Sequence, residues 1–174
     1  MLRLLLLRHA EAIAHSASGD LERPLTAMGR ADARRMGAYF RKSGLAPDFV
    51  LVSPAQRARE TLEMVEHELM QKPACATDSS LHAASVSTLQ ALLARAPREA
   101  QTLMIVGHNP GLAQFANMLV GDGANHDLAQ MRNHFPAPCL AIIDFPQDNW
   151  SAAHAGGGHL DRFVTPAALP GQDI

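Results

Sequence analysis

The chain is poor in cysteine and in large aromatic residues other than phenylalanine. Its 174 residues include 2 cysteines, 1 tryptophan and 1 tyrosine. Two cysteines are too few for a disulfide scaffold. There is no Cys-x-x-Cys pair, and the histidines outside the motifs below lack zinc-ligand spacing, so we expect no metal site. We expect both thiols, Cys75 and Cys139, to be reduced and buried.

An excess of charge is also missing. Lysine and arginine total 15 against 17 aspartate and glutamate, which gives a net charge of -2. Proteins that bind nucleic acid or a membrane surface normally carry a basic excess, so the composition argues against both kinds of partner. A site for an anion would have to be made locally by a few arginines.

Long hydrophobic runs are absent as well. No apolar stretch approaches the ~20 residues that cross a bilayer. The leucines at residues 4–7 stop at Arg8 and are followed by Glu11, a run too short for the core of a signal peptide. We therefore expect no membrane segment and a cytoplasmic location. The length predicts a single domain over residues 1–174, enough to bury about 70% of the unfolded surface.

Strand-length apolar runs alternate with helical periodicity along the chain. The predicted strands are residues 3–7, 49–52, 102–106 and 139–145, with one or two more within 150–164 and a short one around Cys75. The predicted helices are residues 27–42, 54–70, 85–96 and 109–120. Residues 121–138 read as a loop, and the tail after Pro166 as short helix or coil. This alternation predicts an α/β fold, a three-layer α/β/α sandwich with a mostly parallel sheet. The turn at residues 156–158 could add an antiparallel strand.

Four helix starts carry capping residues. Ser85 is a predicted N-cap of the helix at residues 85–96. Thr26 is a predicted N-cap, and Gly44 supplies the stop of the same helix. Ser53 is predicted to cap the next helix with Pro54 in the first helical position. Asn109 is predicted to do the same for a later helix.

Two histidines stand at equivalent points of this pattern. His9 follows the first strand-like run and His108 follows the run at residues 102–106. Ligands of open α/β sheets bind beyond the carboxyl ends of the strands. We therefore expect the two imidazoles to converge on one crevice.

Arginines next to these histidines point to phosphate chemistry. A neutral His9 could attack an electrophile while the guanidinium of Arg8 holds an anion, and phosphorus is the natural electrophile for that pair. Arg57 lies in the first turn of a predicted helix, where free N–H groups already favour anions. Its guanidinium could clamp a phosphate bidentately. His108 could bond a phosphoryl oxygen and oppose the charge that develops in the transition state.

Four motifs in order resemble the histidine phosphatase superfamily, the phosphoglycerate-mutase-like group. The Arg-His-Gly signature is present as Arg8-His9-Ala10, and a later Gly-His-x-Pro is present at residues 107–110. Between them lie Arg-Pro-Leu-Thr at residues 23–26 and an intact Ser-Pro-x-x-Arg-Ala-x-x-Thr at residues 53–61. The short length and the Arg-Pro-Leu-Thr segment look most like SixA-type phosphohistidine phosphatases.

The resemblance implies the phosphoglycerate-mutase-like fold and a two-step reaction. His9 would be the nucleophile that becomes phosphorylated, and Arg8, Arg57 and His108 would form the phosphate pocket. Water would then hydrolyse the phosphohistidine, with no metal and no cofactor. The implied partner is a protein that bears phosphohistidine, such as a phosphotransfer domain. The oligomeric state stays open.

Two positions depart from the family pattern. Ala10 replaces the usual glycine, which is tolerable where the backbone φ is negative. Ser80 stands where larger relatives carry a glutamate general acid. An alkoxide leaving group needs that proton more than the imidazole of phosphohistidine does, so its absence favours N–P substrates. Three other residues remain candidate proton donors: Glu11, Asp78 and His82.

Other functions remain open at this stage. A phosphomonoesterase for small molecules or phosphoproteins could use the same nucleophile. A phosphate-binding adaptor without turnover would show a broken nucleophile or clamp, and none is visible. A mutase is disfavoured because the chain lacks room for the insertions that close over sugar phosphates.

Overall fold

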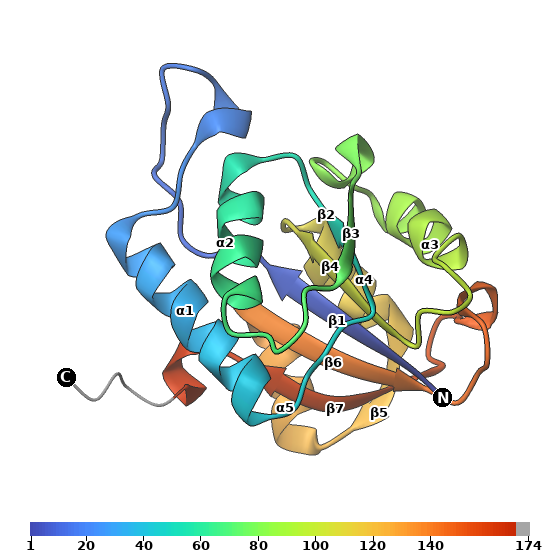
Figure 1. Cartoon of the computed structure of the whole chain (residues 1–174). Helices are drawn as coiled ribbons and strands as arrows, with labels where there is room; N and C mark the ends of the chain where they lie inside the picture. Colours follow the sequence, from blue (N-terminus) through green and yellow to red (C-terminus); the bar gives the residue numbers. More distant parts are fainter. Residues whose placement is uncertain (170–174) are drawn as a thin grey trace.

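One sheet of seven strands organises residues 1–169, the part of the chain that the computed structural model describes (Figure 1). The strand order is β3-β2-β4-β1-β6-β7-β5. The strands are β1 (Leu2–Arg8), β2 (Phe49–Val52), β3 (Ala74–Thr77), β4 (Thr102–Gly107), β5 (Val120–Gly123), β6 (Cys139–Phe145) and β7 (Gly158–Val164). The neighbours β3, β2, β4 and β1 are parallel to one another, and β6 pairs antiparallel with both β1 and β7. The prediction of a mostly parallel sheet is confirmed.

Helices cover both faces of this sheet. They are α1 (Ala27–Lys42), α2 (Gln56–Glu66), α3 (Val86–Ala94), α4 (Gly111–Leu119) and α5 (Asn125–Asn133). Buried side chains of α1 and α2 pack on one face, and those of α3, α4 and α5 pack on the other (Figure 1). The three-layer α/β/α prediction is therefore confirmed. No helix in residues 1–169 is long and apolar enough to span a membrane.

The central position of β1 explains its run of leucines. Leu4 and Leu6 face the core under α3 and α4, whereas Leu5 and Leu7 face the core under α1 and α2. All four side chains are fully buried. A strand covered on both faces must be apolar at every position, and for that reason the pattern shows no alternation.

Most element boundaries agree with the sequence. The predicted bounds of α1, β2 and β6 match the structure. Thr26 caps α1 by accepting a hydrogen bond from the Gly29 N–H, and Gly44 adopts the positive φ expected of a helix stop. Ser85 caps α3 in the same way as Thr26 caps α1.

Three expectations about local structure are wrong. Residues 121–138 are not a loop, since they hold most of β5 and all of α5. Within α5 only Met131 is buried, so the helix has almost no apolar periodicity to detect. Helix α2 is shorter than predicted and begins at Gln56. Cys75 is exposed because β3 is an edge strand, although Cys139 is buried and both thiols are free as expected.

Candidate active site

His9 and His108 meet at the carboxyl ends of two neighbouring strands. Strands β1 and β4 are parallel and in register, with Arg8 opposite Gly107. The His9 N–H donates to the Gly107 carbonyl at 3.1 Å. The two imidazole rings lie 5.0 Å apart, centre to centre. The structure brings them together as the strand-end argument predicts.

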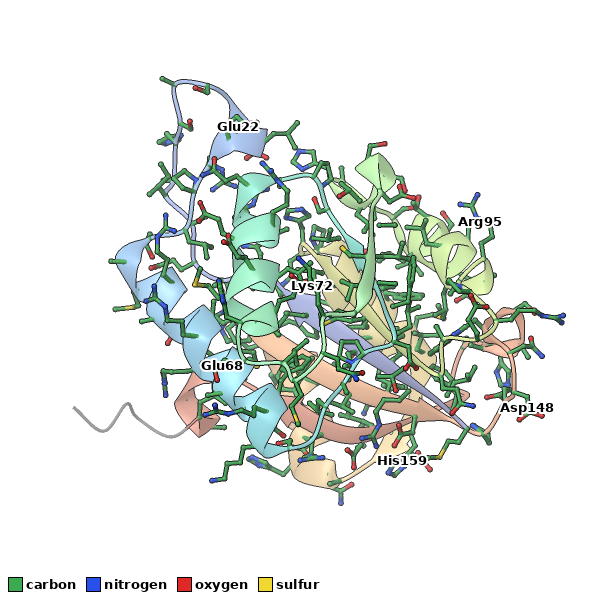
Figure 2. The ribbon with its side chains drawn as sticks, in the orientation of Figure 1. Glu22, Glu68, Lys72, Arg95, Asp148 and His159 are labelled. Atoms are coloured by element: carbon green, nitrogen blue, oxygen red, sulfur yellow. The ribbon has the colours of Figure 1, made fainter. Side chains whose placement is uncertain are left out.

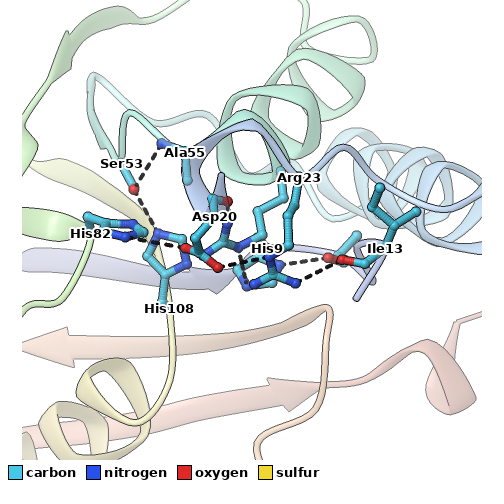
Figure 3. A network of polar contacts seen from close by, with 10 residues as sticks. His9, Ile13, Asp20, Arg23, Ser53, Ala55, His82 and His108 are labelled. Carbon is cyan, nitrogen blue, oxygen red and sulfur yellow. Dashed lines mark hydrogen bonds and ion pairs between the residues drawn. The ribbon is translucent and has the colours of Figure 1, made fainter. Parts of the chain in front are cut away.

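His9 and His108, whose rings are drawn in Figure 3, both line a cavity of about 400 Å³. All four residues predicted to bind or attack a phosphoryl group line it, together with two of the three candidate proton donors. The lining residues are Arg8, His9, Glu11, Ala12, Asp20, Arg23, Arg57, His82, His108, Asn109 and Ala137. The cavity therefore holds three guanidinium groups and two carboxylates.

The contacts of His9 fix the tautomer of its imidazole. Its Nδ1 lies 2.7 Å from the Ala10 carbonyl, which can only accept a hydrogen bond, so the ring proton sits on Nδ1. The Nε2 lone pair then faces the Arg57 Nε–H at 3.3 Å. Burial, followed by the nearby charges of Arg57 and Arg8, lowers the pKa of His9 to about 4. The ring is neutral at pH 7, as nucleophilic attack requires.

Thr61 ties the loop of His9 to helix α2. Its buried hydroxyl accepts a hydrogen bond from the Ala10 N–H at 2.9 Å and donates one to the Arg57 carbonyl at 2.7 Å. The last residue of the Ser-Pro-x-x-Arg-Ala-x-x-Thr motif therefore links the loop of His9 to the backbone of Arg57. Ala10 itself is fully buried and its φ is not positive, so alanine fits where the family has glycine.

Arg57 reaches the cavity from the first turn of α2. Its side chain is only 5% exposed, and burial lowers its pKa. The NH1 group donates to the Asp20 carbonyl at 2.8 Å, and NH2 lies 3.1 Å from the Asp20 carboxylate. Sequence reasoning missed Asp20, because it lies in a polar loop without periodicity; its closeness to Arg23 of the Arg-Pro-Leu-Thr motif was the available signal.

Arg8 carries a cation that no carboxylate in residues 1–169 neutralises. Its NH1 donates to the Phe135 carbonyl at 2.7 Å, and its buried Nε has no hydrogen-bond partner there. Burial lowers the pKa of Arg8. A half-buried cation without a counter-ion is costly, and an anionic ligand would relieve that cost.

Ser53 orients His108. The Ser53 hydroxyl oxygen accepts from the Ala55 N–H at 3.3 Å and lies 2.7 Å from Nε2 of His108 (Figure 3). If the hydroxyl proton goes to Nε2, the imidazole proton is on Nδ1. That atom is buried and has no hydrogen-bond partner among the described residues, so its hydrogen-bonding capacity is unused there. Burial and the neighbouring His9 lower the pKa of His108 to about 3.

These contacts correct two capping predictions. The N-cap position of α2 is Ala55, so Ser53 contacts His108 and the backbone before the helix instead of capping it. The N-cap position of α4 is Pro110, and the Asn109 side chain donates to the Phe135 carbonyl at 2.9 Å. Both polar side chains are engaged in tertiary contacts around the cavity, which no local pattern encodes.

The three candidate proton donors differ in position. Glu11 lines the cavity, and its carboxylate accepts a hydrogen bond from the Thr26 hydroxyl at 2.6 Å. His82 also lines it, with its ring 5.5 Å from that of His108. Asp78 is not brought to this cavity. Its carboxylate accepts two hydrogen bonds from Ser80, which hold the pKa of Asp78 low.

Arg59 and the groups that could bind a metal lie apart from this arrangement. Arg59 donates to the Pro54 carbonyl and does not line the cavity. Within residues 1–169, no three histidine, cysteine, aspartate or glutamate side chains are grouped to hold a metal ion. Metal independence of a reaction at this site stays a prediction.

A family model and two curated relatives match the sequence. The model, described as histidine phosphatase superfamily (branch 1), matches residues 4–90. An uncharacterized chloroplastic protein of Arabidopsis thaliana is 32% identical over 94% of this chain and 78% of its own length. An uncharacterized protein of Mycobacterium leprae is 32% identical over 84% of this chain and 89% of its own length.

Several solved structures share the fold of this chain. A candidate phosphohistidine phosphatase SixA from Nakamurella multipartitia superposes with a TM-score of 0.83 at 28% identity, covering 96% of this chain and 97% of that one. A second candidate SixA, from Agrobacterium tumefaciens, gives 0.79 at 26% identity, covering 95% and 98%. A candidate α-ribazole-5'-phosphate phosphatase of Escherichia coli shares the fold with a TM-score of 0.67 at 18% identity, covering 98% of this chain and 100% of that one.

Proposed function

Because this chain belongs to the histidine phosphatase superfamily, we propose that it hydrolyses phosphohistidine in a partner protein, with His9 as the nucleophile. One observation carries the proposal. The Nε2 lone pair of a neutral, buried imidazole faces a cavity lined by Arg8, Arg23 and Arg57. That combination suits attack on a phosphoryl group and little else.

Binding comes first. The phosphoryl oxygens are held by the guanidinium groups of Arg8 and Arg57 and by the Nδ1–H of His108. Nε of Arg8 and Nδ1 of His108 have no hydrogen-bond partner among the described residues, and NH2 of Arg57 can exchange the Asp20 carboxylate for a ligand. Fixed donors in a partly buried site stabilise the charge that builds on the phosphoryl oxygens in the transition state.

Transfer then proceeds in two balanced steps. Nε2 of His9 gives up its contact with the Arg57 Nε–H and forms a bond to phosphorus as the bond to the substrate nitrogen breaks. The leaving imidazole takes its proton from Glu11, His82 or water. Water next attacks the phosphorus of phospho-His9, releasing inorganic phosphate and neutral His9. Throughout, Nδ1 of His9 keeps its proton on the Ala10 carbonyl, which stabilises the correct tautomer.

The proposed substrate class rests on the leaving group. Ser80 carries no acid and lies outside the cavity, so it supplies no proton for ester cleavage. Glu11 and His82 are the candidate donors within reach, and imidazole needs less help from them than an alkoxide would. The two SixA candidates at 28% and 26% identity support the same choice.

A paired rate measurement tests the proposal. Phosphate release is compared between a phosphohistidine-bearing phosphotransfer domain and p-nitrophenyl phosphate, with and without EDTA. We expect the phosphohistidine protein to be the better substrate by kcat/KM, with no loss in EDTA. A faster reaction with the ester would favour a phosphomonoesterase that uses the same nucleophile.

A further inference from the structure

Asp20 engages Arg57, one of the groups that the proposed reaction assigns to the substrate. Its carboxylate lies 3.1 Å from NH2 of Arg57, 2.8 Å from Nε of Arg23 and 3.3 Å from Nε2 of His82 (Figure 3). Hydrogen bonds from Arg23 and Arg57 outweigh its slight burial and lower the pKa of Asp20, so the group is anionic at pH 7. An internal anion is therefore already bound at the cavity.

This carboxylate and a phosphoryl group need the same donors. Arg57 directs Nε at His9 and both terminal nitrogens at Asp20, so three of its five N–H donors are already engaged. A phosphate gripped by the two terminal nitrogens would compete with Asp20 for the N–H groups of NH1 and NH2. The two anions cannot share those N–H groups at full strength, so binding of one weakens binding of the other.

The placement of Asp20 makes release feasible. Its side chain is 53% exposed, and it begins a short 3-10 helix (Asp20–Glu22) at the mouth of the cavity. The preceding Gly19 has a φ of 104°, and a side chain built there would meet nothing within 4 Å. The carboxylate can turn into water without opening the hydrophobic core.

We propose that Asp20 is an internal competitor that sets the affinity and charge selectivity of the phosphate site. It occupies the clamp in the free protein and yields to a phosphoryl dianion, which brings more charge and more acceptor oxygens than one carboxylate. A monoanion displaces the Asp20 carboxylate less effectively than a dianion, because it brings less charge. The proposal rests on the proposed function, because it takes the cavity to be the phosphate site.

Direct binding of inorganic phosphate at about pH 8, measured by calorimetry, tests this role. The test variant is Asp20→Asn, and Asp20→Ala removes the side chain altogether. Glu22→Gln is the matched control, because Glu22 lies on the same short helix (Figure 2) and its carboxylate has no partner among the described residues. If Asp20 occupies the clamp about nine-tenths of the time, its removal tightens phosphate binding about tenfold.

The possible results distinguish a competing role of Asp20 from the proposed phosphate site itself. Tighter binding in both Asp20 variants, with Glu22→Gln like wild type, supports the competitor. Equal tightening by Glu22→Gln means a general charge effect and overturns it. Unchanged or weaker binding in the Asp20 variants also overturns it, and indicates that Asp20 positions Arg57. Wild-type protein that binds no phosphate, or binds it undiminished after Arg57→Ala, overturns the proposed site itself.

Discussion

Strand β1 carries an arginine near each end, and the two arginines have opposite surroundings. Arg3 donates from Nε and NH2 to both carboxylate oxygens of Asp144, at 2.7 Å each. Its hydrogen bonds to Asp144 raise its pKa. Arg8, five residues further along, contacts one carbonyl and no carboxylate within residues 1–169, and burial lowers its pKa.

The contrast separates a structural cation from a binding cation. A guanidinium that is fully paired in the folded protein has nothing left for a ligand and serves stability. A guanidinium that is half-buried and incompletely paired destabilises the fold until an anion binds to it. The candidate site therefore lies at the carboxyl end of β1, and the amino end carries the structural pair Arg3–Asp144.

The largest expected effect is at the carboxyl end, on His9. His9→Ala should lower turnover by at least about 10⁴-fold, as loss of a nucleophile typically does, while circular dichroism and thermal unfolding stay close to wild type. The wild type should form a phosphoenzyme on His9 that is stable to alkali and labile to acid. Activity within tenfold of wild type, or an acid-stable label on serine, would contradict the assignment.

Exchanging each arginine for methionine tests the comparison directly. Arg8→Met should lower kcat/KM about 10²- to 10³-fold without lowering the free energy of unfolding, because a costly unpaired cation is removed. Arg3→Met should lower the free energy of unfolding by about 2 kcal/mol, because Asp144 is left partly buried and unpaired, and should leave activity near wild type. Urea unfolding and steady-state rates on the two variants measure both quantities. The reverse pattern would reject the division of roles.

Acid should lower the free energy of unfolding, because the two histidines at this end of the sheet have lowered pKa values. The folded pKa of His9 is about 4 and that of His108 about 3, against an ordinary value of 6.5. Between pH 6.5 and 4 the unfolded chain binds protons that the folded protein does not, so the free energy of unfolding falls as the pH drops. We expect a loss on the order of 5 kcal/mol over this window, about half from each histidine. Urea titrations at several pH values should show how steeply the free energy of unfolding falls with pH, and His9→Asn should make this dependence weaker. An unchanged dependence in the variant would show that His9 is not its cause.

The smallest expected effect concerns the orientation of His108. Ser53→Ala removes the hydroxyl that contacts Nε2, so the imidazole proton is no longer directed to Nδ1. We expect kcat to fall about tenfold with little change in stability, a loss typical of one orienting hydrogen bond. Nitrogen NMR of the imidazole should show a changed tautomer ratio. A Ser53→Thr control keeps the hydroxyl and should recover most of the rate.

Much of the fold could be predicted because its signals are local. Continuous apolar runs mark β1 and β4 as strands buried on both faces, and capping residues mark the start of α1 and α3. Helix α5 escaped prediction because it buries one side chain only. Exposure of Cys75 escaped it because strand order, which places β3 at the edge, is a property of the whole sheet.

The sequence by itself determined that His9 and His108 share a crevice, because both follow strands whose carboxyl ends lie at one edge of a parallel sheet. It also indicated an anion site, through Arg8 and Arg57. Only the tertiary structure decided the partners of these groups: Ser53 on His108, Thr61 between nucleophile and clamp, Asp20 on Arg57, and Asp78 away from the cavity. Periodicity and capping record the backbone and the core face, whereas hydrogen bonds between distant polar side chains depend on how loops and helices pack in three dimensions.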